Sequence, residues 1–403
     1  MTRIILISGK GGVGKTTVAA ATGMAAAAHG YRTLVLSFDL AHSLSDAFAL
    51  DEALFVQHQG LPVAVAPRLE LQEIDVQEEM NRYWSDVYRY TAAIMIGGGL
   101  DAVVAEEVAI MPGMEDIVAL LRLNQYVTTG TYDVIVLDCP PTSEALRFVS
   151  ISSTLDWYAR RRLKVDRQLS KLIRPLANMF TEAASQFVPD DDYFDALQRL
   201  FEQLHGIDAL LRDPKITSVR LVTNPDKMVI RETQRAFMYF CMYGMTIDAV
   251  IINRLLPLSD GYFAQWAQAQ AAYAEDIRAY FAPVPVITLP FLAQEVVGVT
   301  QLETFAQQLY AARDPAAFFM DMPSYGFVKE AAGQYRLEIK LPFVPKEHID
   351  LARYGEDMVV RIGAFKRNIL LPRSIVPLHT AGATMDGDTL VVRFTEEHAD
   401  VLD

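Results

Sequence analysis

Short apolar runs alternate with helical patterns over most of the chain. Runs that are apolar at nearly every position are typical of strands buried on both faces of a sheet, and they cover residues 4–8, 33–37, 134–137, 218–223, 249–252 and 284–289. Residues 17–29 are rich in alanine and predict a helix that ends at Gly30. Strands that alternate with helices predict an α/β fold, with a parallel sheet covered on both faces.

Two longer segments interrupt this alternation. Residues 70–126 and 155–211 have helical patterns and carry many large apolar side chains. We expect them to form a helical subdomain inserted between strands of the sheet.

The pattern changes again near residue 315. Residues 315–326 contain Pro323 and Gly326 and are predicted to be a linker. Beyond them, apolar and polar side chains alternate strictly over residues 335–341, and shorter strand patterns follow, at 358–362, 368–371 and 389–394. We therefore divide the chain into a first domain, 1–314, and a second domain, 327–403, predicted to be an antiparallel β-sandwich.

Composition narrows the class of protein. The chain has 403 residues, 51% hydrophobic and 21% charged, which suits two domains with buried cores. Its net charge of −14 argues against nucleic acid as a partner, because that binding needs a basic surface. Asp101, Glu106 and Glu107 interrupt the best candidate for a membrane span. With no signal peptide before the first strand, we expect a cytoplasmic protein.

The clearest chemical motif lies at residues 9–16. They read Gly-Lys-Gly-Gly-Val-Gly-Lys-Thr and fit the phosphate loop G-x-x-x-x-G-K-[ST], with a strand before it and a helix after it, as a chance glycine-rich turn would not have. Lys15 is predicted to reach the β- and γ-phosphates of ATP as a catalytic cation, and the Thr16 hydroxyl to bind Mg²⁺. The expected nucleotide contacts are Gly9, Gly11, Gly12, Val13, Gly14, Lys15, Thr16 and Thr17.

The motif contains a second lysine, Lys10, directly after its first glycine. The sequence Lys-Gly-Gly-Val-Gly-Lys-Thr is the deviant Walker A form, and here the chain resembles the MinD/ArsA group of P-loop ATPases. The resemblance implies a homodimer in which Lys10 crosses to the partner's nucleotide and acts in catalysis, where the γ-phosphate develops negative charge. The alternative is a solvated surface lysine.

Residues 39–48 narrow the resemblance. They read D-L-A-H-S-L-S-D-A-F and are similar to the switch I sequence D-P-A-H-S-L-S-D-A-F of the ArsA branch, which includes the ATPase that targets tail-anchored membrane proteins. The resemblance implies that Asp46 orients the attacking water as a catalytic residue and that Asp39 lies near the Mg²⁺ ion. Leu40 replaces the family's proline, a change that removes no reactive group.

Residues 138–148 resemble the switch II sequence of the same branch, D-T-A-P-T-G-H-T-L-R-F. Asp138 follows an apolar strand, where the family's Walker B carboxylate holds Mg²⁺ through water. Ser143 and Glu144 replace the family's Gly-His pair, which bears on how switch II moves rather than on Mg²⁺ binding.

Contacts to the adenine base are expected late in the chain. Asn253 ends an apolar strand and looks like the family's adenine-reading asparagine, although an ordinary turn asparagine is the alternative. Residues 290–298 resemble the family's second adenine-side loop, which adds Pro290 and Phe291 as expected contacts.

The resemblance also implies a client. In the targeting ATPases the helical segments form a groove across the dimer that holds a transmembrane helix, and a membrane receptor would be a further partner. Methionine is common on surfaces that accept varied apolar partners, and the helical segments here contain Met80, Met95, Met111, Met114 and Met179. These side chains line either such a groove or an ordinary core.

The chain differs from the eukaryotic targeting ATPases in how it could hold a dimer, and it has an additional C-terminal domain. Their eukaryotic members hold the dimer with a CxxC zinc clasp, which Cys139 and Cys241 cannot form, so a constitutive dimer would depend on apolar surface alone. Residues 327–403 resemble the α-crystallin-like domain appended to some ArsA-type ATPases. That domain has strand edges able to bind an extended peptide, or it is a passive stabilising appendage.

These observations favour an ATP-driven targeting factor or chaperone for hydrophobic segments. An arsenite-stimulated pump ATPase is the first alternative, but it requires a soft thiolate site, and two separated cysteines cannot make a three-cysteine cluster. A MinD-like positioning ATPase is the second, and the crystallin-like domain together with the lack of a C-terminal amphipathic helix argues against it.

Overall fold

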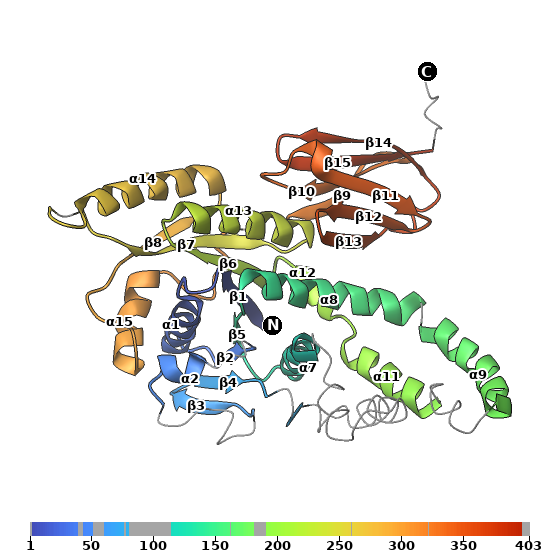
Figure 1. Ribbon diagram of the computed structural model, residues 1–403, viewed down its shortest axis with the longest axis horizontal. Helices are drawn as coiled ribbons and strands as arrows, with labels where there is room; N and C mark the ends of the chain where they lie inside the picture. Colours follow the sequence, from blue (N-terminus) through green and yellow to red (C-terminus); the bar gives the residue numbers. More distant parts are fainter. Residues whose placement is uncertain are drawn as a thin grey trace.

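The computed structural model describes residues 2–38, 43–50, 60–75, 78–79, 114–161, 163–180, 191–258, 260–320 and 322–396 of the chain. At its centre is a sheet with the strand order β3-β4-β2-β5-β1-β6-β7-β8 (Figure 1). The strands are β1 (Arg3–Gly9), β2 (Thr33–Ser37), β3 (Val63–Ala66), β4 (Leu69–Glu73), β5 (Val134–Asp138), β6 (Thr217–Thr223), β7 (Ile247–Leu255) and β8 (Val286–Pro290). Neighbouring strands are parallel except for β3 and β4, which confirms the predicted α/β class.

Helices cover both faces of this sheet, which explains why its strands are apolar throughout. The helices are α1 (Lys15–Ala28), α2 (Ser43–Ala47), α7 (Met114–Thr129), α8 (Thr142–Arg161), α9 (Leu163–Phe180), α11 (Asp191–Gln203), α12 (Ile207–Arg212), α13 (Lys227–Met242), α14 (Ala264–Phe281) and α15 (Val299–Tyr310). On β1, Ile5 and Ile7 pack in the core formed with α1 and α15. Ile4 and Leu6 point to the other face, where they share a core with α7, α8, α12, α13 and α14.

The alanines of α1 allow this helix to lie close against the sheet. Gly23 marks the closest approach, since a Cβ atom there would lie 2.3 Å from Cγ2 of Val35 on β2. The helix begins at Lys15, two positions earlier than predicted, and Gly30 follows it with a positive φ of 94°. This close packing fixes the start of α1, and with it the phosphate loop, relative to β1.

One predicted helical segment begins with a strand. Residues 70–73 belong to β4, which pairs in parallel with β2, whereas we expected residues 70–126 to be helical. The sequence Leu-Glu-Leu-Gln-Glu is short, and its pairing with β2 rather than its own periodicity decides its structure. The described helix in this segment is α7, and residues 155–211 contain α9, α11, α12 and the end of α8.

The C-terminal domain consists of two antiparallel sheets, as predicted. One sheet has the order β14-β15-β10-β9 and the other the order β11-β12-β13. The strands are β9 (Tyr325–Ala331), β10 (Gln334–Lys340), β11 (Ile349–Tyr354), β12 (Asp357–Ile362), β13 (Phe365–Leu370), β14 (His379–Asp386) and β15 (Thr389–Thr395). Gly326 lies within β9 rather than in the linker predicted for residues 315–326, because residues 325–331 pair with β10.

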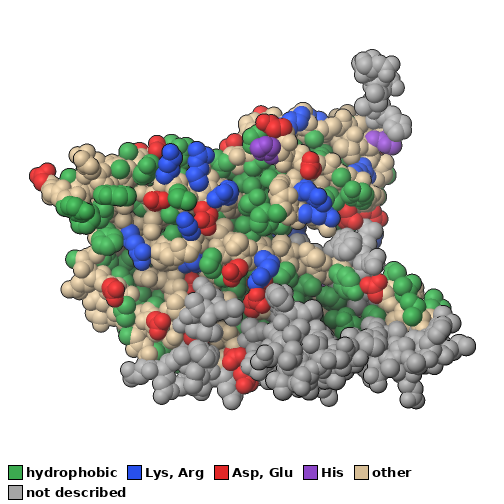
Figure 2. Space-filling view, in the orientation of Figure 1, with side chains coloured by type: hydrophobic (Ala, Val, Ile, Leu, Met, Phe, Trp, Pro, Cys, Tyr) green, Lys and Arg blue, Asp and Glu red, His purple; other side chains and the backbone are tan. Residues whose placement is uncertain are grey.

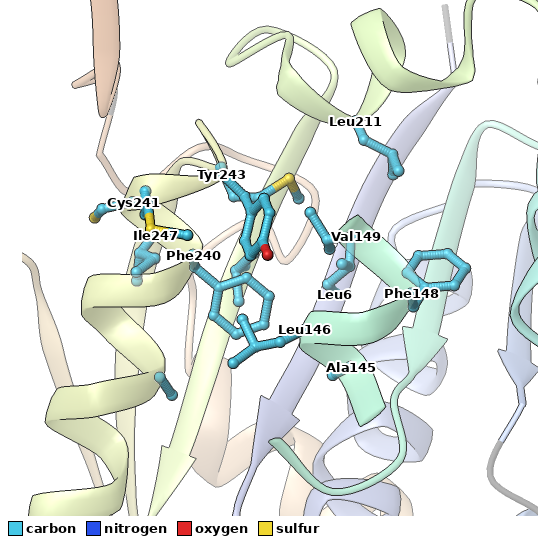
Figure 3. Packing of buried hydrophobic residues seen from close by; sticks show 14 of the residues in the cluster. Leu6, Ala145, Leu146, Phe148, Val149, Leu211, Phe240, Cys241, Tyr243 and Ile247 are labelled. Atoms are coloured by element: carbon cyan, nitrogen blue, oxygen red, sulfur yellow. The ribbon is translucent and has the colours of Figure 1, made fainter. Parts of the chain in front are cut away.

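The sandwich packs on the ATPase domain through α13 and α8. Rings of Tyr239 on α13 and Phe365 on β13 lie 4.1 Å apart between centroids. Arg367, also on β13, is buried and donates a hydrogen bond to the carbonyl of Met242 at the end of α13. Beneath this contact, Phe240 of α13 lies beside Leu146 of α8 in the core that both domains share (Figure 3).

None of the helices in the described part of the chain is long and apolar enough to cross a bilayer.

Candidate nucleotide site

The phosphate loop connects β1 to α1 at the carboxyl ends of the parallel strands. Gly12 and Gly14 adopt positive φ angles of 81° and 93°, which favour glycine. A Cβ atom added at Gly11 or Gly12 would meet nothing within 4 Å, so the loop borders open space on that side. Backbone amides that surround open space at the start of a helix form a suitable cradle for phosphate groups.

Two other glycines of the loop are fixed by close contacts. A Cβ atom on Gly9 would lie 2.2 Å from the carbonyl oxygen of Val222 on β6, and one on Gly14 would lie 2.5 Å from Nδ2 of Asn253. Larger residues at these two positions would push the loop away from β6 and β7. The motif's glycines therefore serve two different purposes, since some open the cradle and others fasten it to the sheet.

Lys15 is the first residue of α1, and its side chain turns back into the phosphate loop. Its side chain is buried, and Nζ donates to the carbonyl oxygen of Lys10 over 3.4 Å. The first turn of α1 contains no acidic residue that would neutralise its positive end. A buried ammonium and an uncompensated helix terminus together make this region attractive to anions.

Oxygen donors suited to Mg²⁺ meet beside the loop. Oγ1 of Thr16 and Oγ of Ser43 on α2 lie 2.9 Å apart in a hydrogen bond. Asp138 is buried at the end of β5, in register with Ile7 on β1 and Ser37 on β2. A carboxylate and hydroxyl groups are hard oxygen ligands of the kind that Mg²⁺ prefers, so these residues fit the ion. Asp39, the other expected metal residue, lies outside the described residues.

Asp46 lies on α2 and its side chain is exposed. The N-terminal end of α2 is held by Glu73 at the end of β4. Oε1 of Glu73 accepts hydrogen bonds from the backbone amides of Leu44 and Ser45, both over 3.0 Å, and from the hydroxyl of Ser45 over 3.3 Å. Glu73 is itself buried, and this one carboxylate oxygen helps to hold the start of α2 in position. The role of Glu73 was not predicted from the sequence, where the residue stands out only as an acidic side chain at the end of the short strand β4.

Glu73 gives a test of how α2 affects turnover. In Glu73→Ala the two amides lose their acceptor, so Asp46 is expected to shift and kcat for ATP to fall by about 10²-fold, with KM little changed. Glu73→Gln keeps a carbonyl oxygen at the same place and is expected to recover most of kcat. Steady-state kinetics of both variants measure the effect. Equal losses in the two variants, or a change in KM alone, would exclude this positioning role.

A cavity of about 610 Å³ opens next to the start of α1 and the ends of β7 and β8. Four residues predicted to contact the nucleotide line it, namely Thr17, Asn253, Pro290 and Phe291. The remaining lining residues are Arg254, Leu292, Ala293, Gln294, Glu295, Val296, Val297 and Phe305. Its size and mixed apolar and polar lining suit a nucleoside.

Asn253 and Arg254 also support the phosphate loop. Nδ2 of Asn253 donates to the carbonyl of Val13 over 2.8 Å, while Oδ1 accepts from the amide of Arg254 over 3.0 Å. Arg254 has a positive φ of 58°, uncommon for a residue with a side chain, and its Nη1 donates to the carbonyl of Gly12 over 3.0 Å. Arg254 was not among the predicted site residues, and its charge at a strand end was the only signal.

Lys10, the second lysine of the motif, points away from the loop in this structure. Its ammonium lies 3.7 Å from a carboxylate oxygen of Glu232 on α13, and both side chains are partly exposed. Such a surface ion pair is weak, so Lys10 can exchange Glu232 for another partner.

Among the methionines predicted to line a client groove or a core, Met80, Met95 and Met111 lie outside the described residues, as do the side chains of Met114 and Met179.

Comparison with known proteins identifies both parts of the chain. Residues 2–311 match the model of a family described as anion-transporting ATPase. Residues 332–394 match a family described as an HSP20-like domain found in ArsA, which agrees with the predicted α-crystallin-like domain.

Relatives of two kinds are similar to this chain. A protein of Aquifex aeolicus named arsenical pump-driving ATPase 1 is 42% identical over 97% of this chain and 99% of its own length. A protein of Chlorobaculum tepidum named arsenical pump-driving ATPase is 36% identical over 98% of this chain and 96% of its own length. A protein of Pyrenophora tritici-repentis named ATPase get3 is 27% identical over 76% of this chain and 91% of its own length.

Proposed function

This chain belongs to the anion-transporting ATPase family, and we propose that it couples ATP hydrolysis to the capture and release of an apolar helical segment of a membrane protein. The observation that carries this proposal is an uncovered apolar face on α9. The ATPase chemistry follows from the family, and this surface supports the proposed client.

The apolar face of α9 consists of four large side chains that water can reach. Val165 is 50% exposed, Leu169 54%, Leu172 71% and Ile173 45%. Their spacing places them along one side of the helix. On another side, Arg167 pairs with Asp191 and Asp195 of α11, over 2.8 Å in each case, which fixes α9 to its neighbour.

Figure 2 shows hydrophobic side chains at the surface on the α9 end of the molecule. A contiguous exposed apolar surface of this kind usually marks a binding site, since it is otherwise an aggregation hazard. An apolar helix fits it because the four side chains form a stripe parallel to the axis of α9.

Hydrolysis is proposed to use the residues around the phosphate loop. Lys15 would contact the β- and γ-phosphates, while Thr16, Asp138 and Asp39 would hold Mg²⁺. Bound Mg²⁺ would supply positive charge that offsets the negative charge developing on the transferred phosphate. Asp46, exposed on α2 and positioned through Glu73, would orient the attacking water.

The nucleoside is proposed to occupy the cavity of about 610 Å³. Asn253 has a second amide hydrogen beyond the one it gives to Val13, and it can offer this to a ring nitrogen of adenine. Pro290 and Phe291 supply apolar surface for the base, and Thr17 lies between this cavity and the phosphate loop.

The working unit is proposed to be a homodimer. The segment between β7 and α14, together with the first turn of α14, exposes one leucine and three aromatic residues, here called the aromatic patch: Leu258 at 72%, Tyr262 at 92%, Phe263 at 56% and Trp266 at 61%. The patch begins shortly after Arg254, which lines the proposed nucleoside cavity, so we place it close to the nucleotide site. A second copy that covers this patch would bring its Lys10 towards the nucleotide.

Substitutions on α9 test the client surface. Leu169→Gln combined with Leu172→Gln is expected to weaken binding of an apolar helical peptide of about 20 residues by roughly 10- to 100-fold, because each leucine contributes apolar burial to the complex. Basal ATPase activity should be unchanged, since both side chains are exposed and α9 lies well away from α1 and the phosphate loop (Figure 1). Anisotropy of a labelled peptide measures binding, with turnover measured in parallel.

The matched control replaces two exposed apolar residues elsewhere, Met322→Gln with Leu370→Gln. It should bind the peptide as the unchanged protein does. If the control loses as much affinity as the α9 variant, or if the α9 variant loses none, this face does not hold the client.

Arsenite stimulation is the second candidate, because the names of two of the relatives described above refer to an arsenical pump. The chain contains two cysteines, and both are buried. Cys241 lies on α13, and burial raises the pKa of its thiol to about 12, so it stays protonated near neutral pH. A soft As(III) site needs thiolate ligands, which this pair is poorly placed to supply.

We therefore expect arsenite or antimonite to leave the rate of ATP hydrolysis unchanged. Phosphate release measured with and without each oxyanion tests this, and Cys139→Ser and Cys241→Ser serve as controls. Stimulation that disappears in Cys139→Ser would favour the pump function over client capture.

A further inference from the structure

A pocket of about 330 Å³ lies between the two domains, and its lining shares no residue with the nucleoside cavity or with α9. One wall is the surface of α13, with Arg231, Gln234, Arg235, Met238 and Tyr239. The other belongs to the β-sandwich, with Phe343, Val344, Pro345, His348 and Ile362. We call this the interdomain pocket.

The α13 wall carries uncompensated positive charge. Arg231 and Arg235 lie one helical turn apart and are exposed. In the part of the chain that the structure describes, neither guanidinium forms an ion pair, although Glu232 between them pairs with Lys10. Like charges at this spacing repel each other, and the chain as a whole has a net charge of −14, so two free arginines on one pocket wall are unusual here.

The sandwich wall is mainly apolar. Phe343 is 40% exposed even though its ring contacts Phe237 and Phe281, with centroids 6.2 and 5.8 Å away. Val344 and Pro345 extend this surface, and Ile362 is buried at its base. Figure 2 shows Lys and Arg side chains over α13 and hydrophobic side chains between α13 and the sandwich.

We propose that the interdomain pocket binds an extended acidic peptide segment of a partner protein in which carboxylate and apolar side chains alternate. Successive side chains of an extended chain point in opposite directions, so acidic residues can face α13 while apolar residues face the sandwich. Alternate residues of such a chain are roughly 7 Å apart, close to the separation of about 6 Å between side chains one helical turn apart. Each guanidinium can therefore bind one carboxylate, in the two-pronged geometry that arginine favours.

The experiment uses the full-length protein and a fluorescein-labelled peptide of three Asp-Leu repeats. Fluorescence anisotropy gives its affinity for the unchanged protein, for Arg231→Glu with Arg235→Glu, and for a control with the same charge change, Arg373→Glu with Arg393→Glu. All four arginines are exposed, so both double variants should fold, which thermal melts monitored by circular dichroism verify. Peptides with Asn for Asp, or Ser for Leu, test the two halves of the recognition.

The α13 double variant is expected to bind the Asp-Leu peptide at least about 10-fold more weakly, and the control variant to bind it normally. The Asn-Leu and Asp-Ser peptides should each lose a similar factor. The proposal is overturned if both double variants lose affinity equally, or if the Asn-Leu peptide binds as well as the acidic one. Displacement of the peptide by low-millimolar inorganic phosphate would instead show a site for small anions and would also overturn it.

Discussion

Lys15→Ala is expected to lower the rate of ATP hydrolysis by about 10³-fold or more, the largest effect of any single substitution considered. The Lys15 ammonium is buried in the loop, 3.4 Å from the Lys10 carbonyl, and it is positioned before nucleotide arrives. A preorganised charge of this kind stabilises the transition state without a cost of reorganisation. Alanine leaves the loop glycines in place but removes the cation that is proposed to act on the transferred phosphate.

Phosphate release measures this loss, and a fluorescent nucleotide measures binding separately. Lys329→Ala is a suitable control, because this exposed lysine lies on β9 of the sandwich. Turnover in Lys15→Ala within a few fold of that control would mean that the loop does not act on the γ-phosphate as proposed.

Weakening the dimer is expected to have the second largest effect. Tyr262→Ser with Trp266→Ser removes two large exposed rings from the aromatic patch and should shift the protein towards monomer. Activity per subunit should then fall by about 10²-fold at low protein concentration and recover as concentration rises. Lys10→Ala should behave differently, because it should lose turnover at every concentration while the dimer still forms.

Analytical ultracentrifugation and ATPase assays over one dilution series measure both quantities. Tyr354→Ser is the matched control, since this ring is 69% exposed on the sandwich. Activity per subunit that stays constant down to a demonstrated monomer would contradict a cross-subunit role for Lys10.

Much of the candidate nucleotide site is open to prediction because its expected chemistry is local in sequence. The phosphate loop combines a strand, fixed glycine spacing and a helix within a short segment, so one motif specifies both backbone and function. Asn253, Pro290 and Phe291 were predicted through the family resemblance, and the fold places all three on one cavity.

The parts that escaped prediction depend on contacts between distant segments. Glu73 reaches amides 28 and 29 residues earlier in the chain, a pairing that follows from the position of β4 beside β2. Residues 70–73 are too short to show a strand period, and sheet pairing decides their structure. The exposed face of α9 is visible in sequence only as an amphipathic pattern, because the pattern does not show whether another element covers the apolar side.

The interdomain pocket could not be predicted from the sequence for the same reason. Arg231 and Arg235 belong to an ordinary helix in sequence, and Phe343 to a loop. These residues form a pocket only because α13 packs against the sandwich. The same packing buries Arg367, and desolvation together with the nearby charge of Arg212 lowers the pKa of its guanidinium to about 9.

The most direct test of the central claim is the affinity of the protein for an apolar helical peptide of about 20 residues in different nucleotide states. Capture is expected to be at least about 10-fold tighter with a non-hydrolysable ATP analogue than with ADP, because only a difference in affinity between the two states can couple hydrolysis to release. The difference should disappear in Lys15→Ala. Equal affinity in both states, or no binding in any state, would contradict the proposed coupling.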